Sequence, residues 1–435
     1  MRGESSPDPV ARFRDERWTA GVIGLGYVGL PLAVAASEAG LDVIGFDIAE
    51  ERVAALSGGS SHVGDVSDGE LRGALDRGAM FTADAAMLSK ADAIFIAVPS
   101  PLGRNRQPDT SFIEAAAEIV SAVARPGQLI SLESTTYPGT TDEIILPALE
   151  AAGLALDGDV FVCFSPERVD PGNTLRTADI PKVVGGVSSL SGAVAAAAYG
   201  RFVTSVHVVS TARAAELSKL LENTYRAVNI ALVNELAQIS HAFDVDVWEV
   251  IDAAATKPFG YQAFYPGPGV GGHCIPLDPQ YLAWRAKEKH IATRFVDLAE
   301  NINLQMPAWV VDRIQDELNQ RGQPVRGTRI LLVGMAYKRN IADDRESPSS
   351  EVMRRLADLS AELGLLDPHV APERLARHGH EVVTAVEAGD WSMAVVLTDH
   401  DDLDYAAIAA AVPVVFDTRG TYRRRGLDRD NVVVL

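Results

Sequence analysis

One glycine-rich segment, residues 267–279, combines the residue types that could do covalent chemistry. It reads Gly-Pro-Gly-Val-Gly-Gly-His-Cys-Ile-Pro-Leu-Asp-Pro, so Cys274 follows the glycines directly and Asp278 lies four residues later. A thiol can form both a hemithioacetal and a thioester, and a neighbouring lysine would favour its thiolate. The glycines indicate backbone that a ligand approaches closely. A buried structural cysteine is the commoner role for this residue type, so chemistry alone leaves both interpretations open.

A second group of polar residues repeats at the spacing of a helix. The group comprises Glu216, Lys219, Asn223 and Arg226. At about 100° per residue they share one face of a helix. Lys219 and Asn223 are hydrogen-bond donors, and the lysine adds positive charge where an alkoxide would develop. A solvated polar face would give the same spacing, so that alternative also stays open.

The third group is a glycine motif near the N-terminus, Gly24-Leu25-Gly26-Tyr27-Val28-Gly29. Gly24 permits a tight turn, Gly26 lets the backbone approach a pyrophosphate, and Gly29 allows a helix to pack closely on a strand. Asp47 ends the next expected strand, where a carboxylate binds a ribose 2′-hydroxyl and repels a 2′-phosphate. The order of strand, glycines, helix and acid predicts NAD as the ligand. A glycine turn in an unrelated α/β protein is the alternative.

The elements that must position these groups alternate along the chain. Short apolar runs separate helical stretches from residue 18 to about 205 and again from residue 329. Continuous apolar strands between helices indicate parallel sheets covered on both faces. Residues 212–243 contain neither glycine nor proline and predict one long helix, of the kind that bridges domains or forms an interface. We therefore predict an α/β fold of two Rossmann-like, doubly wound parallel-sheet domains joined by a long central helix.

Composition argues against several classes of protein. A formal charge of −20 opposes binding to nucleic acid or to an anionic membrane. No run of 18 apolar residues predicts a membrane span, and residues 1–17 lack the apolar segment that export needs. The chain has two cysteines, Cys163 and Cys274, and one histidine, His273, in the glycine-rich segment. We therefore expect no metal site and a reducing, cytoplasmic setting.

Together these motifs resemble the UDP-glucose/GDP-mannose dehydrogenase family over nearly the whole chain after residue 17. Further matching marks are Ser134-Thr135, Ser165-Pro166-Glu167-Arg168, and Lys338 with the segment Asp-Asp-Arg-Glu-Ser-Pro at 343–348. The resemblance implies NAD-dependent oxidation of a UDP-linked hexose at C6 to its uronic acid, in a homodimer formed through the central helix. The expected parts are a flexible tail at 1–17, an NAD-binding domain at 18–205, a central helical, dimerisation and catalytic-cysteine region at 206–322, and a UDP-sugar-binding domain at 323–435.

The resemblance also implies a role for individual residues. The expected catalytic residues are Cys274 as nucleophile, Lys219 and Asn223 as the oxyanion and water-positioning pair, Asp278 in support of base catalysis, and Glu167 in acid/base work or water placement. The expected NAD contacts are Gly24, Gly26, Tyr27, Val28, Gly29, Asp47, Arg52, Ser100, Thr135 and Arg345. The expected substrate contacts are Arg168, Val169, Arg226 and Lys338.

Two positions in the glycine-rich segment bear on the choice of sugar. Family members that act on UDP-glucose or GDP-mannose usually read Gly-Gly-Ser-Cys and then Pro-Lys-Asp, whereas His273 and Leu277 replace the serine and the lysine here. Together with residues 264–269, this form resembles the UDP-N-acetylhexosamine branch. We expect UDP-N-acetylglucosamine, with its manno and galacto epimers close behind and UDP-glucose as the alternative. A one-step hydroxy-acid or sugar-phosphate dehydrogenase and a non-catalytic NAD-binding protein are the alternatives from other classes.

Overall fold

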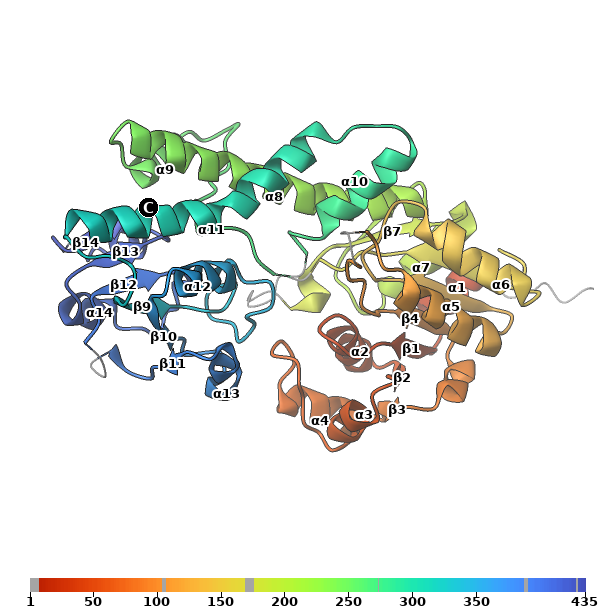
Figure 1. Ribbon diagram of the computed structural model, residues 1–435. Helices are drawn as coiled ribbons and strands as arrows, with labels where there is room; N and C mark the ends of the chain where they lie inside the picture. The colour runs from red at the N-terminus through yellow and green to blue at the C-terminus, as the bar shows by residue number, and fades with distance from the viewer. Residues whose placement is uncertain (1–7, 104–106, 169–175, 273, 387–389, 428) are drawn as a thin grey trace, which may run out of the picture. The chain divides into compact units, whose positions relative to one another are not determined.

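The computed structural model describes residues 8–103, 107–168, 176–272, 274–386, 390–427 and 429–435 (Figure 1). It divides into two compact units, the first formed by Met1–Glu222 and Gln280–Ile291 and the second by Asn223–Pro279 and Ala292–Leu435. Each unit is built on one sheet flanked by helices. The prediction of two Rossmann-like α/β units is therefore confirmed.

The sheet of the first unit has the strand order β3-β2-β1-β4-β5-β6-β7-β8. Its strands are β1 (Thr19–Ile23), β2 (Asp42–Phe46), β3 (Met80–Thr82), β4 (Ala93–Ile96), β5 (Gln128–Leu132), β6 (Val160–Phe164), β7 (Lys182–Gly186) and β8 (Val206–Val209). Strands β1 to β6 are parallel, whereas β7 pairs antiparallel with β6 and parallel with β8. The strand order reverses between β1 and β4, which is where such sheets open a crevice at the carboxyl ends of their strands.

Alternate residues of a strand face opposite sides of the sheet, and in this sheet both sides carry apolar side chains. Helices therefore cover both faces. One core joins Val22 and Phe95 to α2 and α7, and the other joins Ile94 and Ile130 to α5 and α6. The helices of this unit are α1 (Pro9–Asp15), α2 (Gly29–Glu38), α3 (Glu50–Ser57), α4 (Asp68–Asp76), α5 (Ser111–Val123), α6 (Leu146–Ala151) and α7 (Ser189–Tyr199).

The expected flexible tail is wrong for residues 9–15, which form α1. Asp8 caps the helix by accepting the Val10 N–H at 3.0 Å, and Pro9 occupies the first turn. Phe13 is wholly buried and packs edge-to-face on Trp18 with ring centres 5.5 Å apart. The charged residues around Phe13 favoured a disordered segment. Burial of this one aromatic ring stabilises the packed helix. Residues 1–7 lie outside the described part of the chain.

The sheet of the second unit has the order β11-β10-β9-β12-β13-β14, with every pair parallel. Its strands are β9 (Arg329–Val333), β10 (Glu362–Leu366), β11 (Glu381–Val382), β12 (Met393–Val396), β13 (Val415–Asp417) and β14 (Val432–Val434). Helices α11 (Arg294–Gln320) and α12 (Pro348–Asp358) pack on one face, and α14 (Tyr405–Ala411) packs on the other. The strand order reverses between β9 and β12, so this sheet has a second switch point. The remaining helices of the unit are α9 (Val247–Ala255), α13 (Pro372–Leu375) and α15 (Thr421–Arg424).

The predicted long helix is α8 (Ala212–Ala242), which spans 31 residues. Both α8 and α10 (Asp278–Glu288) contribute residues to each of the two units. None of the helices in the described ranges has the length and hydropathy needed to cross a bilayer.

Candidate active site

The turn between β1 and α2 needs glycine for two different reasons. Gly24 has φ +88°, and a Cβ on it would lie 2.5 Å from the Ala97 carbonyl oxygen. A Cβ on Gly29 would lie 1.9 Å from the Gly24 oxygen, whereas one on Gly26 would have no atom within 4 Å. The helix that follows has no side-chain cap at Val28. Open space at Gly26 and uncapped N–H groups together fit the pyrophosphate of a dinucleotide.

Asp47 follows β2 and stabilises this turn by hydrogen bonding. Its buried carboxylate accepts the N–H groups of Leu25 and Ala49, each at 2.9 Å, and the Arg52 guanidinium at 2.7 Å. Burial raises the pKa of Asp47, but these three donors outweigh it and hold the pKa below its ordinary value. Asp47 therefore presents a negative charge beside the glycine turn, and Arg52 contacts that carboxylate.

Ser100 and Thr135 follow β4 and β5, at the carboxyl edge of the same sheet. The Ser134 hydroxyl donates to the Val98 carbonyl at 2.7 Å and ties the two loops together. The Ser100 carbonyl accepts the Tyr281 hydroxyl at 2.9 Å. Because β4 is the neighbour of β1, both loops lie on one side of the switch point and the glycine turn on the other.

Glu167 lies at the edge of a buried charge network that sequence reasoning missed. The Lys182 ammonium contacts the Glu133 carboxylate and lies 3.6 Å from Oε2 of Glu167. Burial lowers the pKa of Lys182, but the two carboxylates outweigh it and raise the pKa, so the lysine stays charged. Tyr199 donates a further hydrogen bond to Glu133. Glu167 is therefore a nearly buried carboxylate held beside a fixed positive charge.

Arg168, next in the chain, pairs with Glu222 of α8 at 2.8 Å and donates to the Pro181 carbonyl at 2.9 Å. Its expected contact with the substrate stays a prediction. Val169 lies outside the described residues.

The Cys274 segment forms a turn that leads directly into α10. The Cys274 carbonyl accepts the N–H of Leu277 at 3.2 Å and that of Asp278 at 2.9 Å. The side-chain amide of Asn223 donates to the Asp278 carboxylate, which is 3% exposed. Three of the predicted catalytic residues are thereby joined within the second unit. Cys274 and Asp278 are joined by a backbone hydrogen bond, and Asn223 is joined to Asp278 through its side chain.

The glycines before Cys274 pack closely against other parts of the second unit, which is a reason for glycine at three positions, and the expected approach of a ligand stays a prediction. A Cβ on Gly267 would lie 2.3 Å from the Arg419 guanidinium, and one on Gly271 would lie 2.7 Å from the Glu346 carbonyl. Gly272 has φ +88°, and a Cβ on it would lie 2.7 Å from the Tyr337 ring. These neighbours are distant in sequence, and the glycines let the segment pass beneath them. His273 lies outside the described residues.

Two polar residues of α8 in the first unit are buried, which disfavours a solvated face there. Glu216 accepts the N–H groups of Gly139 at 2.5 Å and Thr141 at 2.9 Å, as well as the Thr141 hydroxyl at 2.7 Å. Burial raises the pKa of Glu216 against the opposing effect of these donors. Lys219, one turn later, is 6% exposed, and within the described residues no hydrogen bond or ion pair reaches it. A buried ammonium of this kind favours an anionic partner.

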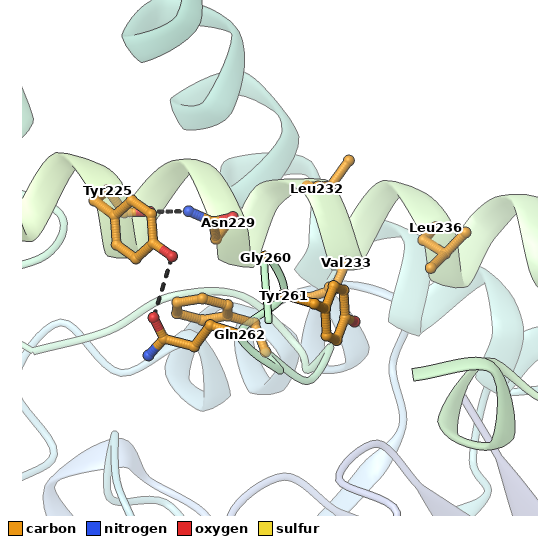
Figure 2. A pocket seen from close by; sticks show the side chains of 9 residues that line it. Tyr225, Asn229, Leu232, Val233, Leu236, Gly260, Tyr261 and Gln262 are labelled. Atoms are coloured by element: carbon orange, nitrogen blue, oxygen red, sulfur yellow. Dashed lines mark hydrogen bonds between the residues drawn. The ribbon is translucent and has the colours of Figure 1, made fainter. Parts of the chain in front are cut away.

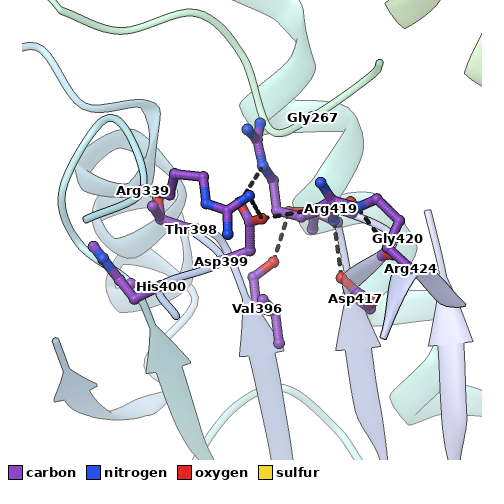
Figure 3. A network of polar contacts seen from close by, with 12 residues as sticks. Gly267, Arg339, Val396, Thr398, Asp399, His400, Asp417, Arg419, Gly420 and Arg424 are labelled. Atoms are coloured by element: carbon purple, nitrogen blue, oxygen red, sulfur yellow. Dashed lines mark hydrogen bonds and ion pairs between the residues drawn. The ribbon is translucent and has the colours of Figure 1, made fainter. Parts of the chain in front are cut away.

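Arginines surround one buried carboxylate at the carboxyl edge of the second sheet (Figure 3). Asp399 contacts Arg424 at 2.8 Å, Arg419 at 3.5 Å and Arg339 at 4.0 Å. Burial raises the pKa of Asp399, but the guanidinium groups outweigh it and lower the pKa. Arg339 also contacts Asp401, so three guanidinium groups face two carboxylates and leave a net positive charge. Lys338 precedes Arg339 in the chain, and this balance of charge fits a diphosphate.

Two further predicted residues have positions in the second unit. Arg345 is exposed and pairs with Asp343 at 2.6 Å. Arg226 is exposed on α8. Their expected contacts with cofactor and substrate stay predictions. Sequence reasoning did not find Arg419 and Arg424, although the charged run after β13 was the available signal.

A cavity of about 520 Å³ lies beside α8 in the second unit (Figure 2). Its lining is mostly apolar, and the Tyr225 hydroxyl donates to Gln262 at 3.1 Å across one side of it. The lining residues are Tyr225, Asn229, Leu232, Val233, Leu236, Gly260, Tyr261, Gln262 and Phe264.

Comparison with protein families matches three consecutive parts of the chain. The NAD-binding domain of the UDP-glucose/GDP-mannose dehydrogenase family matches residues 19–203, the central domain of that family matches 213–305, and its UDP-binding domain matches 331–424. The chain belongs to the UDP-glucose/GDP-mannose dehydrogenase family. It is therefore an NAD-dependent nucleotide-sugar dehydrogenase, with its cofactor domain built around β1 and its UDP-binding domain built around β9.

Individual relatives within the family cover most of the chain. A UDP-N-acetyl-D-glucosamine 6-dehydrogenase from Pseudomonas aeruginosa is 36% identical over 355 residues, covering 81% of this chain and 83% of the relative. The structure of a UDP-D-ManNAc dehydrogenase from Pyrococcus horikoshii has a TM-score of 0.84 at 30% identity, covering 95% of this chain and 97% of that one. A UDP-glucose dehydrogenase from Pyrobaculum islandicum has a TM-score of 0.85 at 26% identity, covering 99% and 98%.

The two cysteines should differ sharply in reactivity. Burial raises the pKa of Cys163 to about 12, so about one thiol in ten thousand is ionised at pH 8. Cys274 is only half-buried. Iodoacetamide at pH 8 should therefore label Cys274 and leave Cys163 unmodified, as measured by peptide mapping. Equal labelling of both cysteines in the folded protein would contradict these environments.

Proposed function

We propose that the protein is a UDP-N-acetyl-D-glucosamine 6-dehydrogenase, or acts on the manno or galacto epimer, and oxidises C6 to the uronic acid through Cys274. The observation that carries this proposal is the contact of Asn223 with Asp278 at the turn that begins at Cys274. A one-step alcohol dehydrogenase needs neither the thiol nor a water-positioning pair beside it.

The residues divide the chemistry among them. Lys219 and Asn223 stabilise the oxygen on C6 as its proton leaves, through a water that Asp278 helps to hold. Bound NAD would supply the hydride acceptor for each of the two oxidations, with one NAD used in each. The Cys274 thiolate adds to the aldehyde carbon and keeps it bound as a hemithioacetal, which the second oxidation converts to a thioester. Water placed by Glu167 then cleaves the carbon–sulfur bond, which releases the carboxylate and regenerates the thiol.

The cofactor contacts in this proposal follow the switch point of the first sheet. The glycine turn with Tyr27 and Val28 would hold the pyrophosphate, and Asp47 with Arg52 would bind the adenosine ribose. Ser100 and Thr135 would lie on the nicotinamide side. Arg345 would complete the cofactor site, and Lys338, Arg168, Val169 and Arg226 would bind the UDP-sugar.

Support for an N-acetylated sugar comes from the glycine-rich segment and from the names of relatives. Leu277 stands where UDP-glucose enzymes usually carry lysine, and two relatives are named for N-acetylhexosamine substrates. Overall similarity of fold does not separate the sugars, because a UDP-glucose dehydrogenase has a comparable TM-score of 0.85. UDP-glucose therefore stands as the second candidate substrate.

We also propose that a second copy of the chain covers the apolar face of α8. Tyr225, Leu232 and Ile239 recur at every seventh position and are 48%, 59% and 46% exposed. Large apolar side chains at this spacing form the seam between packed helices. The cavity lined by Tyr225 and Leu232 lies on the same helix and would receive side chains from the partner copy. A cytoplasmic setting belongs to the same proposal, since catalysis needs Cys274 as a thiol.

A panel of UDP-sugars tests the reaction and the substrate together. Complete turnover should form two NADH per sugar and a C6 carboxylate. The value of kcat/KM for UDP-N-acetylglucosamine or an epimer should exceed that for UDP-glucose by at least about tenfold, or about 1.4 kcal/mol. One NADH with an accumulating aldehyde would overturn the double oxidation. Preference for UDP-glucose would overturn only the choice of sugar.

The proposed seam can be tested by charge substitution. Leu232→Glu would place a carboxylate in the seam and should convert the dimer to monomer in sedimentation velocity at micromolar concentration. Ile48→Glu is the matched control, because Ile48 is 75% exposed on the first unit and should leave the dimer intact. A monomeric parent protein, or a dimer unaffected by Leu232→Glu, would rule out this interface.

A further inference from the structure

His400 is a fully buried histidine at the second switch point, in the loop that follows β12. Both of its ring nitrogens are engaged. Nδ1 accepts the Asn340 N–H at 3.0 Å, and Nε2 lies 3.1 Å from Oδ2 of Asp367. A nitrogen that accepts an N–H carries no proton, and a carboxylate offers only lone pairs. The geometry thus assigns the neutral imidazole with its hydrogen on Nε2.

Asp367, the hydrogen-bond partner of His400, is itself held in place by backbone N–H groups. Its Oδ2 also accepts the N–H groups of Met335 at 2.7 Å and Ala336 at 2.9 Å. Its Oδ1 accepts the N–H groups of His369 and Val370, at 2.8 and 2.9 Å. With five donors on two oxygens, this carboxylate is fully used inside the protein and is not available to a ribose.

The segment 335–340 is therefore attached at both ends to one buried pair. Met335 and Ala336 are bound to Asp367, and Asn340 is bound to His400, which is itself bound to Asp367. The Ala336 carbonyl also accepts the Thr398 hydroxyl at 2.6 Å. Lys338 lies inside this closed segment, two residues from either attachment. Its backbone position is consequently fixed by contacts that do not involve its own side chain.

A second contact secures the same segment from the His400 loop. The Asn340 amide donates to the Asp401 carboxylate at 2.6 Å, and its amide oxygen accepts the Asp401 N–H at 2.9 Å. Asn340 has φ +60°, a left-handed conformation that asparagine tolerates better than most residues. Arg339 contacts Asp401 as well and lies beside Thr398 and Asp399 (Figure 3). The loops after β9 and β12 are thus joined across the switch point.

We propose that His400 is a positioning residue for the nucleotide sugar, which holds the Lys338 segment so that the lysine meets the diphosphate. This inference deepens the proposed function, since it rests on Lys338 as a diphosphate contact. His400 does not touch the ligand in this account and acts through the Asn340 backbone. Its loss should weaken binding of UDP itself, whichever sugar the enzyme prefers.

His400→Gln is the test variant, because glutamine can still donate to the buried Asp367 but has no acceptor at the position of Nδ1. In the full-length protein, calorimetric titration with UDP should give a Kd about tenfold higher than in the parent, the loss expected for one buried hydrogen bond. KM for the UDP-sugar should rise by the same factor, while kcat and KM for NAD stay within about twofold. His400→Asn places an oxygen near the position of Nδ1 and should recover most of the affinity.

Tyr405→Phe is the matched control. The Tyr405 hydroxyl donates to the His400 carbonyl at 2.9 Å. The variant therefore removes a contact of the His400 backbone and leaves the contacts of the His400 ring unchanged. UDP affinity should stay within about twofold of the parent. An equal loss of affinity in Tyr405→Phe and His400→Gln would show that any disturbance of the loop suffices, and would overturn the specific role of the ring.

A double-mutant cycle separates this inference from the proposed function. If His400 acts through Lys338, then His400→Gln in a Lys338→Ala background should change the Kd for UDP by less than about twofold. Independent losses that multiply would contradict the inference. If Lys338→Ala weakens UDP but His400→Gln does not, the inference alone fails. If Lys338→Ala leaves UDP affinity unchanged, the proposed diphosphate contact fails and the inference fails with it.

If His400→Gln does not fold, His400→Asn replaces it as the test variant. A folded His400→Asn protein with the parent affinity for UDP supports the role of the acceptor at Nδ1. A folded His400→Asn protein that binds UDP about tenfold more weakly overturns that role.

Discussion

The hydrogen bond from Asn223 to Asp278 is the contact on which the proposed chemistry depends. It connects α8 to the first residue of α10, and the carbonyl that begins that turn belongs to Cys274. Removal of Asn223 would take one hydrogen bond from the nearly buried Asp278 carboxylate, at a cost of about 1–3 kcal/mol. The glycines at 267–272 serve the same end, because they let the cysteine segment pass beneath Tyr337 and Arg419. Close packing within the second unit is therefore one reason why that segment is rich in glycine.

The two sheets share one arrangement of a glycine turn and a carboxylate at the switch point, and the two carboxylates have different partners. In each, a glycine with φ near +87° follows the first strand and donates its N–H to the end of the second strand, as Gly24 does to Phe46 and Gly334 does to Leu366. In each, a carboxylate after the second strand accepts backbone N–H from the turn that the glycine begins, one group at Asp47 and two at Asp367. Asp47 contacts Arg52 at a turn with open space at Gly26, whereas Asp367 is fully used by backbone N–H groups and His400. The first turn thus suits a dinucleotide, and the second serves to hold Lys338.

Local patterns predicted much of this from sequence, and long-range contacts account for what they missed. The glycine turn, Asp47 and α8 were predictable because strand, turn and helix signals lie within a few residues of one another. Asp8 and Pro9 are a comparable signal for α1, but the charged residues around them concealed it. The neighbours of Gly267 and Gly272 lie far along the chain, so spacing could not reveal them. The pairing of Glu133 with Lys182, 49 residues apart, likewise depends on the sheet, because β5 ends just before Glu133 and the antiparallel strand β7 begins at Lys182.

Covalent capture of the aldehyde by Cys274 can be tested by measuring uronic acid formation in the Cys274→Ala variant. The substitution removes the thiol but leaves the glycine turn, Asp47 and Lys338 in place, so NAD and UDP should bind as in the parent protein. Cys163→Ala is the matched control, because that thiol lies buried in the core of the first unit. Cys274→Ala should lower uronic acid formation by several orders of magnitude, while Cys163→Ala should stay near the parent rate. Near-normal formation of uronic acid by Cys274→Ala would contradict the thioester route.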